Sequence, residues 1–399
     1  MNEPIFIARQ DTLEQEILPA HWLSQYKLFG EESYTFQDKE IWKRLCMSRA
    51  AANDRDMHAE ALEEMLTTFS AEHTGKWMLT VYGMDAAVLE GLASMAAIAA
   101  NGTAMAAVAG NALLMHAIAN SETAMQAISR SQTAMQRVAN NTTAMDAIGR
   151  SRIARDAVQA SPYYNSYIKE NDMAIAKLAV GLANLESAGY SGMAGVAADS
   201  TAMTAVAASA TAMTAVAASS VARNAISASP YYDEKIKEND MAIAKLVVGF
   251  ANLASANYSS MAGVAADATA MTAVAASSTA MTAVAASATA MGKIAAVDAA
   301  LSKLAASTTA MDALYTRKKK LAGGSASKSG KFIILEISQS NAFNTSKYGY
   351  AKLSDNSMPD WSDYLAKYAF FRKYPKYATY MRNDTDSDDY IYYFDITSP

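Results

Sequence analysis

The sequence predicts a mainly α-helical protein, built as a solenoid or fibrous array of short two-turn helices from ten-residue repeats. Three observations predict it: one phrase recurs every ten residues, a polar residue begins most copies (Gly91 stands there in the first), and alanine fills most places between. A fixed period sustained over such a length is typical of repeat arrays. A helical N-terminal head is predicted before this array, and a small α+β C-terminal domain is predicted after it.

The repeat is clearest at residues 209–219, SATAMTAVAAS. Val or Ile usually follows its methionine by three residues, as Val216 follows Met213. The methionines that anchor the copies are Met95, Met105, Met115, Met125, Met135, Met145, Met193, Met203, Met213, Met261, Met271, Met281, Met291 and Met311.

The ten-residue period argues against one continuous helix. Ten residues fall short of three whole α-helical turns by roughly 80°, so a Met/Val pair would spiral around the helix instead of forming a stripe. Coiled coils also require a mean apolar spacing near 3.5 or about 3.67 residues. Two alternatives to a solenoid of short helices stay open, an oligomeric helical fibre and a β-solenoid, although the high alanine content counts against the latter.

Polar residues mark where each short helix begins. A Ser, Asn or Asp stands four residues before the methionine, where its side chain can accept a hydrogen bond from a free helix N–H group. Gly110, Asn120 and Asn140 precede such positions, and we expect them to end helices in the left-handed conformation. A two-turn helix is unstable alone, so we expect Met, Ala at i+2 and Val or Ile at i+3 to form an edge buried against neighbouring helices. The predicted caps are Asn101, Asn111, Ser121, Ser131, Asn141, Asp199 and Ser209.

Residues 1–82 form a distinct head with ordinary charge content, and residues 83–160 form the first array of repeats. Amphipathic helices are predicted at residues 41–52 and 57–69. Repeat arrays need capping elements at their ends. The head is therefore interpreted as a cap, an attachment module, or both.

A second level of repetition follows. Residues 161–228 and residues 229–316 carry two copies of a block that begins SPYY and recurs after 68 residues, with terminal repeats after the second copy. Each copy should contain a longer helix that begins at Asn171-Asp172 or Asn239-Asp240. We expect the Pro-Tyr-Tyr aromatic rings to brace it.

The pattern changes again after residue 316. Residues 317–330 are predicted to be a basic Gly/Ser linker, and residues 331–399 a tyrosine-rich α+β domain. KFIILEIS, YGYAKL, YATYM and YIYYFDI are predicted as strands, and WSDYLAKYAFFRKY as a helix. Tyrosine gives a large contact area with a polar tip, which suits a binding surface. The candidate binding residues are Tyr348, Tyr350, Trp361, Tyr390 and Tyr392.

Signals for chemistry are weak, and the sequence predicts neither an enzyme nor a cofactor. Asp384, Asp386, Asp388 and Asp395 have the spacing of a calcium loop, but the sixth place lacks the usual glycine, so an acidic turn between strands is the competing interpretation. Pairing Glu336 with Asp360 or Asp363 would suit a glycosidase, although such pairs occur in any chain segment of this size. The four histidines have no metal-ligand spacing.

Composition limits the classes of partner. A net charge of −5 gives no general attraction to nucleic acid. Cys46 is the single cysteine, which excludes an intramolecular disulfide. The sequence contains no run of 18 consecutive apolar residues, so it does not predict a membrane-spanning helix. The acidic N-terminus does not resemble a secretory signal. We therefore expect synthesis and assembly in a cytoplasm.

The phrases SATAMTAVAAS, SQTAMQRVANN and SETAMQAISRS resemble the Ala-rich ten-residue repeats of tail-fibre and other virion structural proteins of tailed bacteriophages. The resemblance covers roughly residues 90 to 315. It implies a virion appendage with a docking head, a repetitive shaft and a tip that contacts the host surface or another virion subunit. Such proteins are usually homo-oligomers, often trimers, and the implied partners are tail, baseplate or capsid proteins and a host-surface receptor. The alternatives are a capsid decoration or adaptor protein, and a bacterial repeat scaffold that binds a partner protein.

Overall fold

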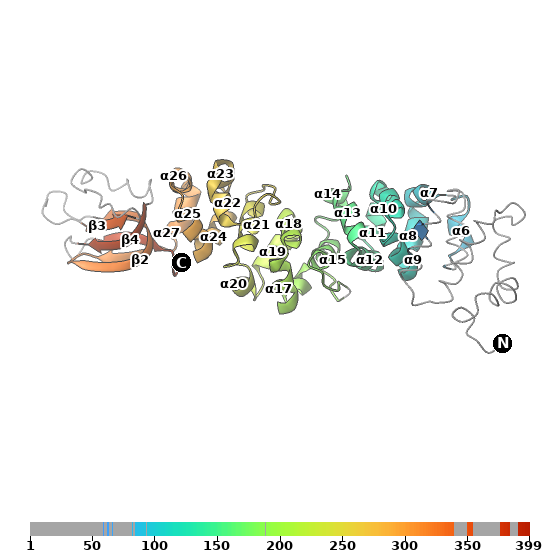
Figure 1. The fold of residues 1–399 in the computed structure, drawn as a ribbon, viewed down its shortest axis with the longest axis horizontal. Coiled ribbons are helices and arrows are strands. Elements are labelled where there is room, and N and C mark those ends of the chain that lie inside the picture. Colours follow the sequence, from blue (N-terminus) through green and yellow to red (C-terminus); the bar gives the residue numbers. More distant parts are fainter. Residues whose placement is uncertain are drawn as a thin grey trace, which may run out of the picture. The chain divides into compact units, whose positions relative to one another are not determined.

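The computed structural model describes Ala59, Leu62, Glu63, Leu66, Tyr82 and residues 84–92, 94–187, 189–338, 349–353, 376–383 and 390–399. The contacts divide the chain into two compact units, residues 1–196 and residues 197–399. The cut falls inside the first copy of the duplicated block, whereas the sequence placed its boundaries at the block ends. The described part is mostly helical, as expected, and ends in a small antiparallel sheet (Figure 1).

The first unit contains short helices in direct succession. They are α6 (Ala86–Leu89), α7 (Met95–Ala100), α8 (Gly102–Gly110), α9 (Ala112–Ala119), α10 (Glu122–Ser129), α11 (Gln132–Ala139), α12 (Thr142–Arg150), α13 (Arg152–Gln159), α14 (Tyr164–Tyr167) and α15 (Asp172–Leu182), with α16 (Met193–Ala197) at the cut between the units. The predicted helix at 41–52 lies outside the described residues. Four residues of the one predicted at 57–69 are described, and all four are helical.

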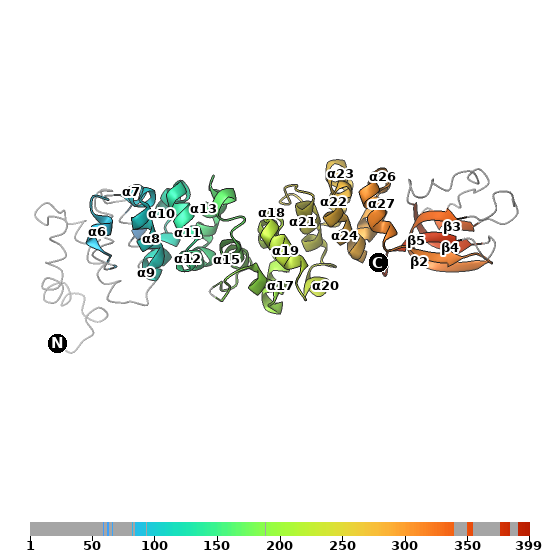
Figure 2. The ribbon, with the colours of Figure 1, turned by 180° about the vertical axis from the view of Figure 1, so that it is seen from behind.

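The second unit continues the same plan and then changes to strands (Figure 2). Its helices are α17 (Ser200–Ala208), α18 (Ala210–Ala218), α19 (Ser220–Ser227), α20 (Tyr232–Lys235), α21 (Asp240–Phe250), α22 (Met261–Ala266), α23 (Ala268–Ala276), α24 (Ser278–Ala286), α25 (Ala288–Ala295), α26 (Asp298–Ala306) and α27 (Thr308–Tyr315). Its strands are β1 (Lys319–Ala322), β2 (Ala326–Ser338), β3 (Gly349–Leu353), β4 (Lys376–Asn383) and β5 (Tyr390–Asp395).

The methionine and the Val or Ile three residues later form the buried edge that the repeat predicts. In α18 both Met213 and Val216 are fully buried, while Thr211 is exposed. The alanines that complete this edge in α18 are Ala212, directly before the methionine, and Ala217, directly after the valine. The expected position at i+2 instead lies on the flank in several helices, such as Ala205 of α17, which is half-buried.

Most helices of the array pack against the third helix that follows them. In the first unit, α8 contacts α11, α9 contacts α12 and α12 contacts α15. In the second unit, α18 contacts α21, α21 contacts α24 and α24 contacts α27. Consecutive helices turn sharply, by 100° between α8 and α9, 99° between α17 and α18, and 101° between α23 and α24. The buried edge of one helix can therefore pack against the helix three repeats before it and the helix three repeats after it.

Every predicted cap of the array starts a helix and accepts a backbone hydrogen bond: Asn101, Asn111, Ser121, Ser131, Asn141, Asp199 and Ser209. The expected left-handed helix ends are wrong. Asn120 and Asn140 have φ of −100° and −97°, and Gly110 is the last residue of α8. The physical reason is that an extended cap residue makes the turn itself: Ser209 has φ of −94° and ψ of 114°, ending α17 and beginning α18.

Many caps also bind a helix other than their own, through a donor that the sequence analysis did not consider. The Ser131 hydroxyl accepts from Ala134 N and donates to the carbonyl of Ala99, 2.6 Å away. In the second unit the Ser307 hydroxyl accepts from Ala310 N and donates to the carbonyl of Ala275 at 2.5 Å. We call this pair of bonds the cap bridge. Other donors at the same spacing of 32 residues are Ser151, Ser161, Asn171, Ser229 and Asn239.

The longer helix of each block copy begins at its Asn cap as predicted, and it packs unusually closely. A Cβ atom on Gly181 of α15 would lie 2.1 Å from the carbonyl oxygen of Gly149 in α12. In the second copy a Cβ atom on Gly249 would lie 2.4 Å from the carbonyl oxygen of Ala217. Both positions thus require glycine, because the backbones of the two helices are in contact and leave no room for a Cβ atom. Tyr164 and Tyr232 are half-buried, and burial raises the pKa of both to about 12. Their packing against the long helices stays a prediction.

The sheet is antiparallel with strand order β1-β5-β2-β4-β3. The segment predicted to be a basic Gly/Ser linker instead forms β1 and the first part of β2, joined by a turn in which Gly324 and Ser325 have positive φ. β1 pairs with β5 and the first part of β2 pairs with β4, so the backbone of these residues is hydrogen-bonded to strands that composition alone could not reveal. One face of the sheet presents Phe394 and Ile396 to the core of α24, α25 and α27. The predicted helix WSDYLAKYAFFRKY lies outside the described residues.

Among the described helices, none is by itself long and apolar enough to cross a bilayer. The pairs α8–α9, α17–α18 and α23–α24 pass that test of length and composition when each pair is taken together, although both helices of each pair are bent relative to each other.

We expect Met213→Asp to lower the free energy of unfolding by about 4 kcal/mol, because an unpaired carboxylate would replace a fully buried thioether. Thr214→Asp is the matched control, since Thr214 is only half-buried, and it should be mild. Thermal and urea unfolding followed by circular dichroism measures both. An equal loss for the two variants would contradict the inward methionine edge.

The cap bridge can be tested at Ser307. Ser307→Ala removes both bonds and should cost about 2 kcal/mol, since a cap and one further hydrogen bond each contribute about 1 kcal/mol. Ser307→Asn should retain most of the stability, because Asn171 and Asn239 make both bonds elsewhere in the chain. The comparison is by urea unfolding. If the Asn variant were as unstable as the Ala variant, the bridging bond would have no energetic role.

Candidate functional site

Lysine and tyrosine side chains gather where the last helix leads into the sheet. Lys318 Nζ lies 4.5 Å from the ring centroid of Tyr392 and 4.8 Å from that of Tyr315. Lys320 Nζ lies 4.4 Å from the ring centroid of Tyr390. The Tyr390 and Tyr392 ring centroids are 6.1 Å apart. We call these five residues the Lys–Tyr surface.

Strand periodicity explains this arrangement. Successive side chains point to opposite faces of a strand, so Tyr390 and Tyr392 share one face of β5 while Ile391 between them is buried. Strand β1 pairs with β5 and places Lys320 directly opposite Tyr392. Tyr315 joins them because α27 ends there. Its hydroxyl donates to Glu336 at 2.9 Å, which ties the helix to β2.

The Lys–Tyr surface offers ammonium groups and phenol rings at the edge of the sheet. Each cation–π contact contributes about 0.5–1 kcal/mol when exposed, so the rings hold the lysine side chains in place without neutralising them. Lys318 and Lys320 are exposed and both tyrosines are half-buried. The arrangement suits recognition of a polar or anionic partner, since tyrosine rings contribute contact area at a low entropic cost.

On the opposite face of the sheet, the charged side chains pair with one another. Lys328 donates to the Tyr393 hydroxyl at 3.0 Å, and this bond raises the lysine pKa. Asp395 lies 3.4 Å from Lys319 Nζ and 3.6 Å from Lys328 Nζ. Burial alone would raise the pKa of Asp395, but hydrogen bonds from Thr397 and the charge of Lys319 outweigh it and lower the pKa. Asp395 therefore serves as a buried counter-ion.

Several predicted site residues lie outside the described residues, namely Tyr348, Trp361, Asp384, Asp386 and Asp388, together with Asp360 and Asp363. Tyr350 is on β3, at the edge opposite to β1 in the strand order, so the structure does not join it to Tyr390 and Tyr392. Within the described ranges, no three His, Cys, Asp or Glu side chains are placed to hold a metal ion. The sequence analysis missed Lys318 and Lys320 as the residues that contact Tyr390 and Tyr392, because it assigned both lysines to a linker.

Two equivalent lysines are buried, one in each block copy, and their surroundings differ. Lys177 Nζ lies 2.6 Å from Asp146 Oδ1 and donates to the carbonyl of Ser187 at 3.2 Å. Lys245 Nζ donates to the carbonyl of Ser255 at 3.0 Å. The residue 68 positions after Asp146, which has the corresponding place relative to Lys245, is Thr214. Burial consequently lowers the pKa of Lys245, and each lysine anchors the loop after its long helix.

This difference predicts opposite responses to one substitution. Lys177→Met should cost about 3 kcal/mol, because it leaves the Asp146 carboxylate without its cation. Lys245→Met, the matched variant, should be neutral or stabilising, because it removes an ammonium group bound only by carbonyls. Urea unfolding measures both at neutral pH.

The pH dependence provides a second readout for Lys245. Its folded pKa lies below the unfolded value of about 10.4, so the unfolded chain binds more protons between the two values and wild-type stability rises with pH there. Lys245→Met should remove that rise. Equal losses for the two Met variants, with unchanged pH profiles, would contradict the assignment.

No family model matches the chain. No curated protein matches it either.

Proposed function

We propose that this chain is a structural protein of a tailed-bacteriophage virion. In this proposal the helix array is a solenoid that spaces an N-terminal docking segment from the C-terminal sheet, and the sheet contacts the host surface or another virion subunit. The observation that carries the structural role is how the repeats use their side chains. The long apolar ones are buried and many polar ones cap helices or make cap bridges, whereas Lys318, Lys320, Tyr390 and Tyr392 project from the sheet.

The interpretation of the array as a solenoid is supported by contacts inside each unit. Most helices contact their third successor, the consecutive pairs noted above bend by about 100°, and the cap bridges repeat at 32 residues. In an array of this kind each repeat contacts only its near neighbours, so length can grow by duplication. The 68-residue block is an example of such growth.

Contacts at each end of the helix array support the presence of capping elements there. In the first unit, Glu63 accepts hydrogen bonds from the hydroxyls of Ser121 and Thr123, so a head residue binds the start of α10. In the second unit, Phe394 and Ile396 of the sheet region join the core of the last helices. The phage assignment itself rests on the resemblance of the repeat phrase. The sheet is the part we assign to partner contact.

The first experiment is light scattering coupled to gel filtration on the full chain, followed by co-sedimentation with particles and with host cells. A homo-oligomer that co-sediments with particles, or with cells through the sheet, is the expected result. A monomer that associates with no particle component and captures one cellular protein would favour a bacterial repeat scaffold instead. Turnover of a surface glycan would contradict the structural role.

The Lys–Tyr surface should carry the partner contact. We expect the double variant Tyr390→Ser with Tyr392→Ser to weaken association with the particle or host surface at least tenfold, which corresponds to about 1.4 kcal/mol. Tyr380→Ser, a half-buried tyrosine on β4 of the same sheet, is the matched control. Unchanged binding by the double variant, with its circular dichroism spectrum intact, would exclude this surface.

A further inference from the structure

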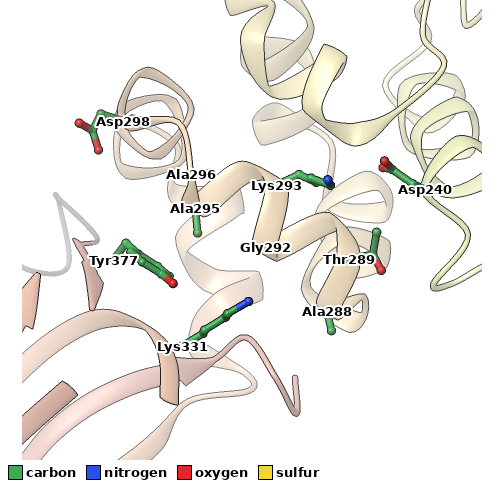
Figure 3. Close-up of a pocket in the computed structure, with 10 residues that line it drawn as sticks. All are labelled: Asp240, Ala288, Thr289, Gly292, Lys293, Ala295, Ala296, Asp298, Lys331 and Tyr377. Atoms are coloured by element: carbon green, nitrogen blue, oxygen red, sulfur yellow. The ribbon is translucent and has the colours of Figure 1, made fainter. Parts of the chain in front are cut away.

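A cavity of about 820 Å³ lies in the second unit between α25, the start of α21 and the sheet. This volume is within the range of sites that hold small molecules. Its floor is the outer side of α25, where Ala288, Gly292 and Ala296 leave room. Figure 3 shows Lys331 and Tyr377 extending from the sheet toward α25, and Lys293 extending from α25 toward Asp240.

The Thr289 hydroxyl of this cavity donates to the carbonyl of Glu238 at 3.3 Å, but three other donors have no hydrogen-bond partner among the described residues. Lys293 and Lys331 are both exposed, and the structure gives neither ammonium group a hydrogen bond or an ion pair within the described residues. The same holds for the Tyr377 hydroxyl, although its ring packs against the core. Lys331 and Tyr377 thus supply a cation and a neutral donor at the same wall of the cavity.

The carboxylates of the cavity are held differently. Asp240 Oδ1 accepts from Met261 N at 2.7 Å, and its other oxygen has no hydrogen bond within the described part of the chain, so it can accept from a ligand. Asp298 begins α26, where the helix dipole stabilises a negative charge. The start of α25 is already occupied, because Glu238 accepts from the amides of Ala288 and Thr289 at 3.0 and 2.8 Å. Attraction for an anion therefore comes from the lysines.

The repeat departs from its own pattern where it lines this cavity. The place of Gly292 is taken by threonine in four other repeats of the second unit, and the place of Lys293 by alanine. A glycine inside a helix costs about 1 kcal/mol relative to alanine. Packing of the chain does not demand it, since a Cβ atom there would meet only Ile396, at an ordinary contact distance of 3.8 Å. The substitutions open the floor and add a cation.

We propose that this cavity binds a small hydroxylated anion, the chemistry shared by sugar phosphates and sugar acids. The acidic group lies between Lys331 and Tyr377, and ligand hydroxyls donate to Asp240 while Lys293 contacts the far end. Neutral sugars lack the charge for Lys331, and bare phosphate lacks the hydroxyls for Asp240. The site is independent of the proposed virion role.

The test is isothermal titration calorimetry of the full chain with glucose 6-phosphate and with glucuronate, which distinguish the two kinds of acidic group. Glucose and inorganic phosphate are the component controls. We expect saturable binding of at least one hydroxylated anion, with both components at least tenfold weaker. No saturation by either anion at about 5 mM, or equal affinity for inorganic phosphate, would overturn the proposal.

Variants locate the binding. Lys331→Met should weaken the affinity about tenfold and Lys293→Met about threefold, whereas Lys303→Met on α26, outside the cavity, should leave it unchanged. Gly292→Ala keeps the test decisive if a lysine variant folds poorly, because it should raise the melting temperature while still weakening the affinity by filling the floor. Binding unaffected by Gly292→Ala and by both cavity lysine variants would place the ligand elsewhere and overturn the proposal.

Discussion

The cap bridge is the interaction on which the array depends. A serine hydroxyl such as that of Ser131 can accept one hydrogen bond and donate another at the same time. The accepted bond starts its own helix, and the donated bond reaches a carbonyl left unpaired at the end of an earlier helix. A single small side chain thus satisfies two helix ends in different repeats. Short helices with few large side chains gain cohesion that their alanine-rich core supplies only weakly.

The two block copies show how the same backbone accepts different chemistry. The loop after the long helix is anchored by a buried lysine in both, yet only Lys177 has a carboxylate partner. Close backbone contact at Gly181 and Gly249 is preserved in both copies. Backbone geometry is therefore the shared constraint, because a Cβ atom cannot be accommodated there. Charge around the lysine is free to differ.

The sheet ends the array and provides most of the features that suit binding. Its inner face completes the core that the last helices would otherwise expose. Strand β1 is an extension of the chain that leaves α27, so the basic residues after that helix are fixed beside the tyrosines of β5. The cavity over α25 arises at the same junction, where Lys331 and Tyr377 face a helix of the array. Both candidate sites exist because two kinds of structure meet.

The sequence by itself determined the helix lengths, the buried Met and Val or Ile edge and the cap positions, because these depend on local periodicity and on short-range hydrogen bonds. Residues such as Met213 and Ser209 could be assigned from spacing alone. It also indicated the strands of the C-terminal region and the two tyrosines of β5.

Only the tertiary structure decided which helices pack together, since contact with the third successor joins residues about thirty positions apart. The cap bridge, the need for Gly181 and the pairing of Lys177 with Asp146 follow from that packing. The same limit explains the missed strand β1: Lys319 and Lys320 read as part of a linker until β5, more than seventy residues later, supplies their hydrogen-bonding partner. Local sequence carries no information about a partner that distant.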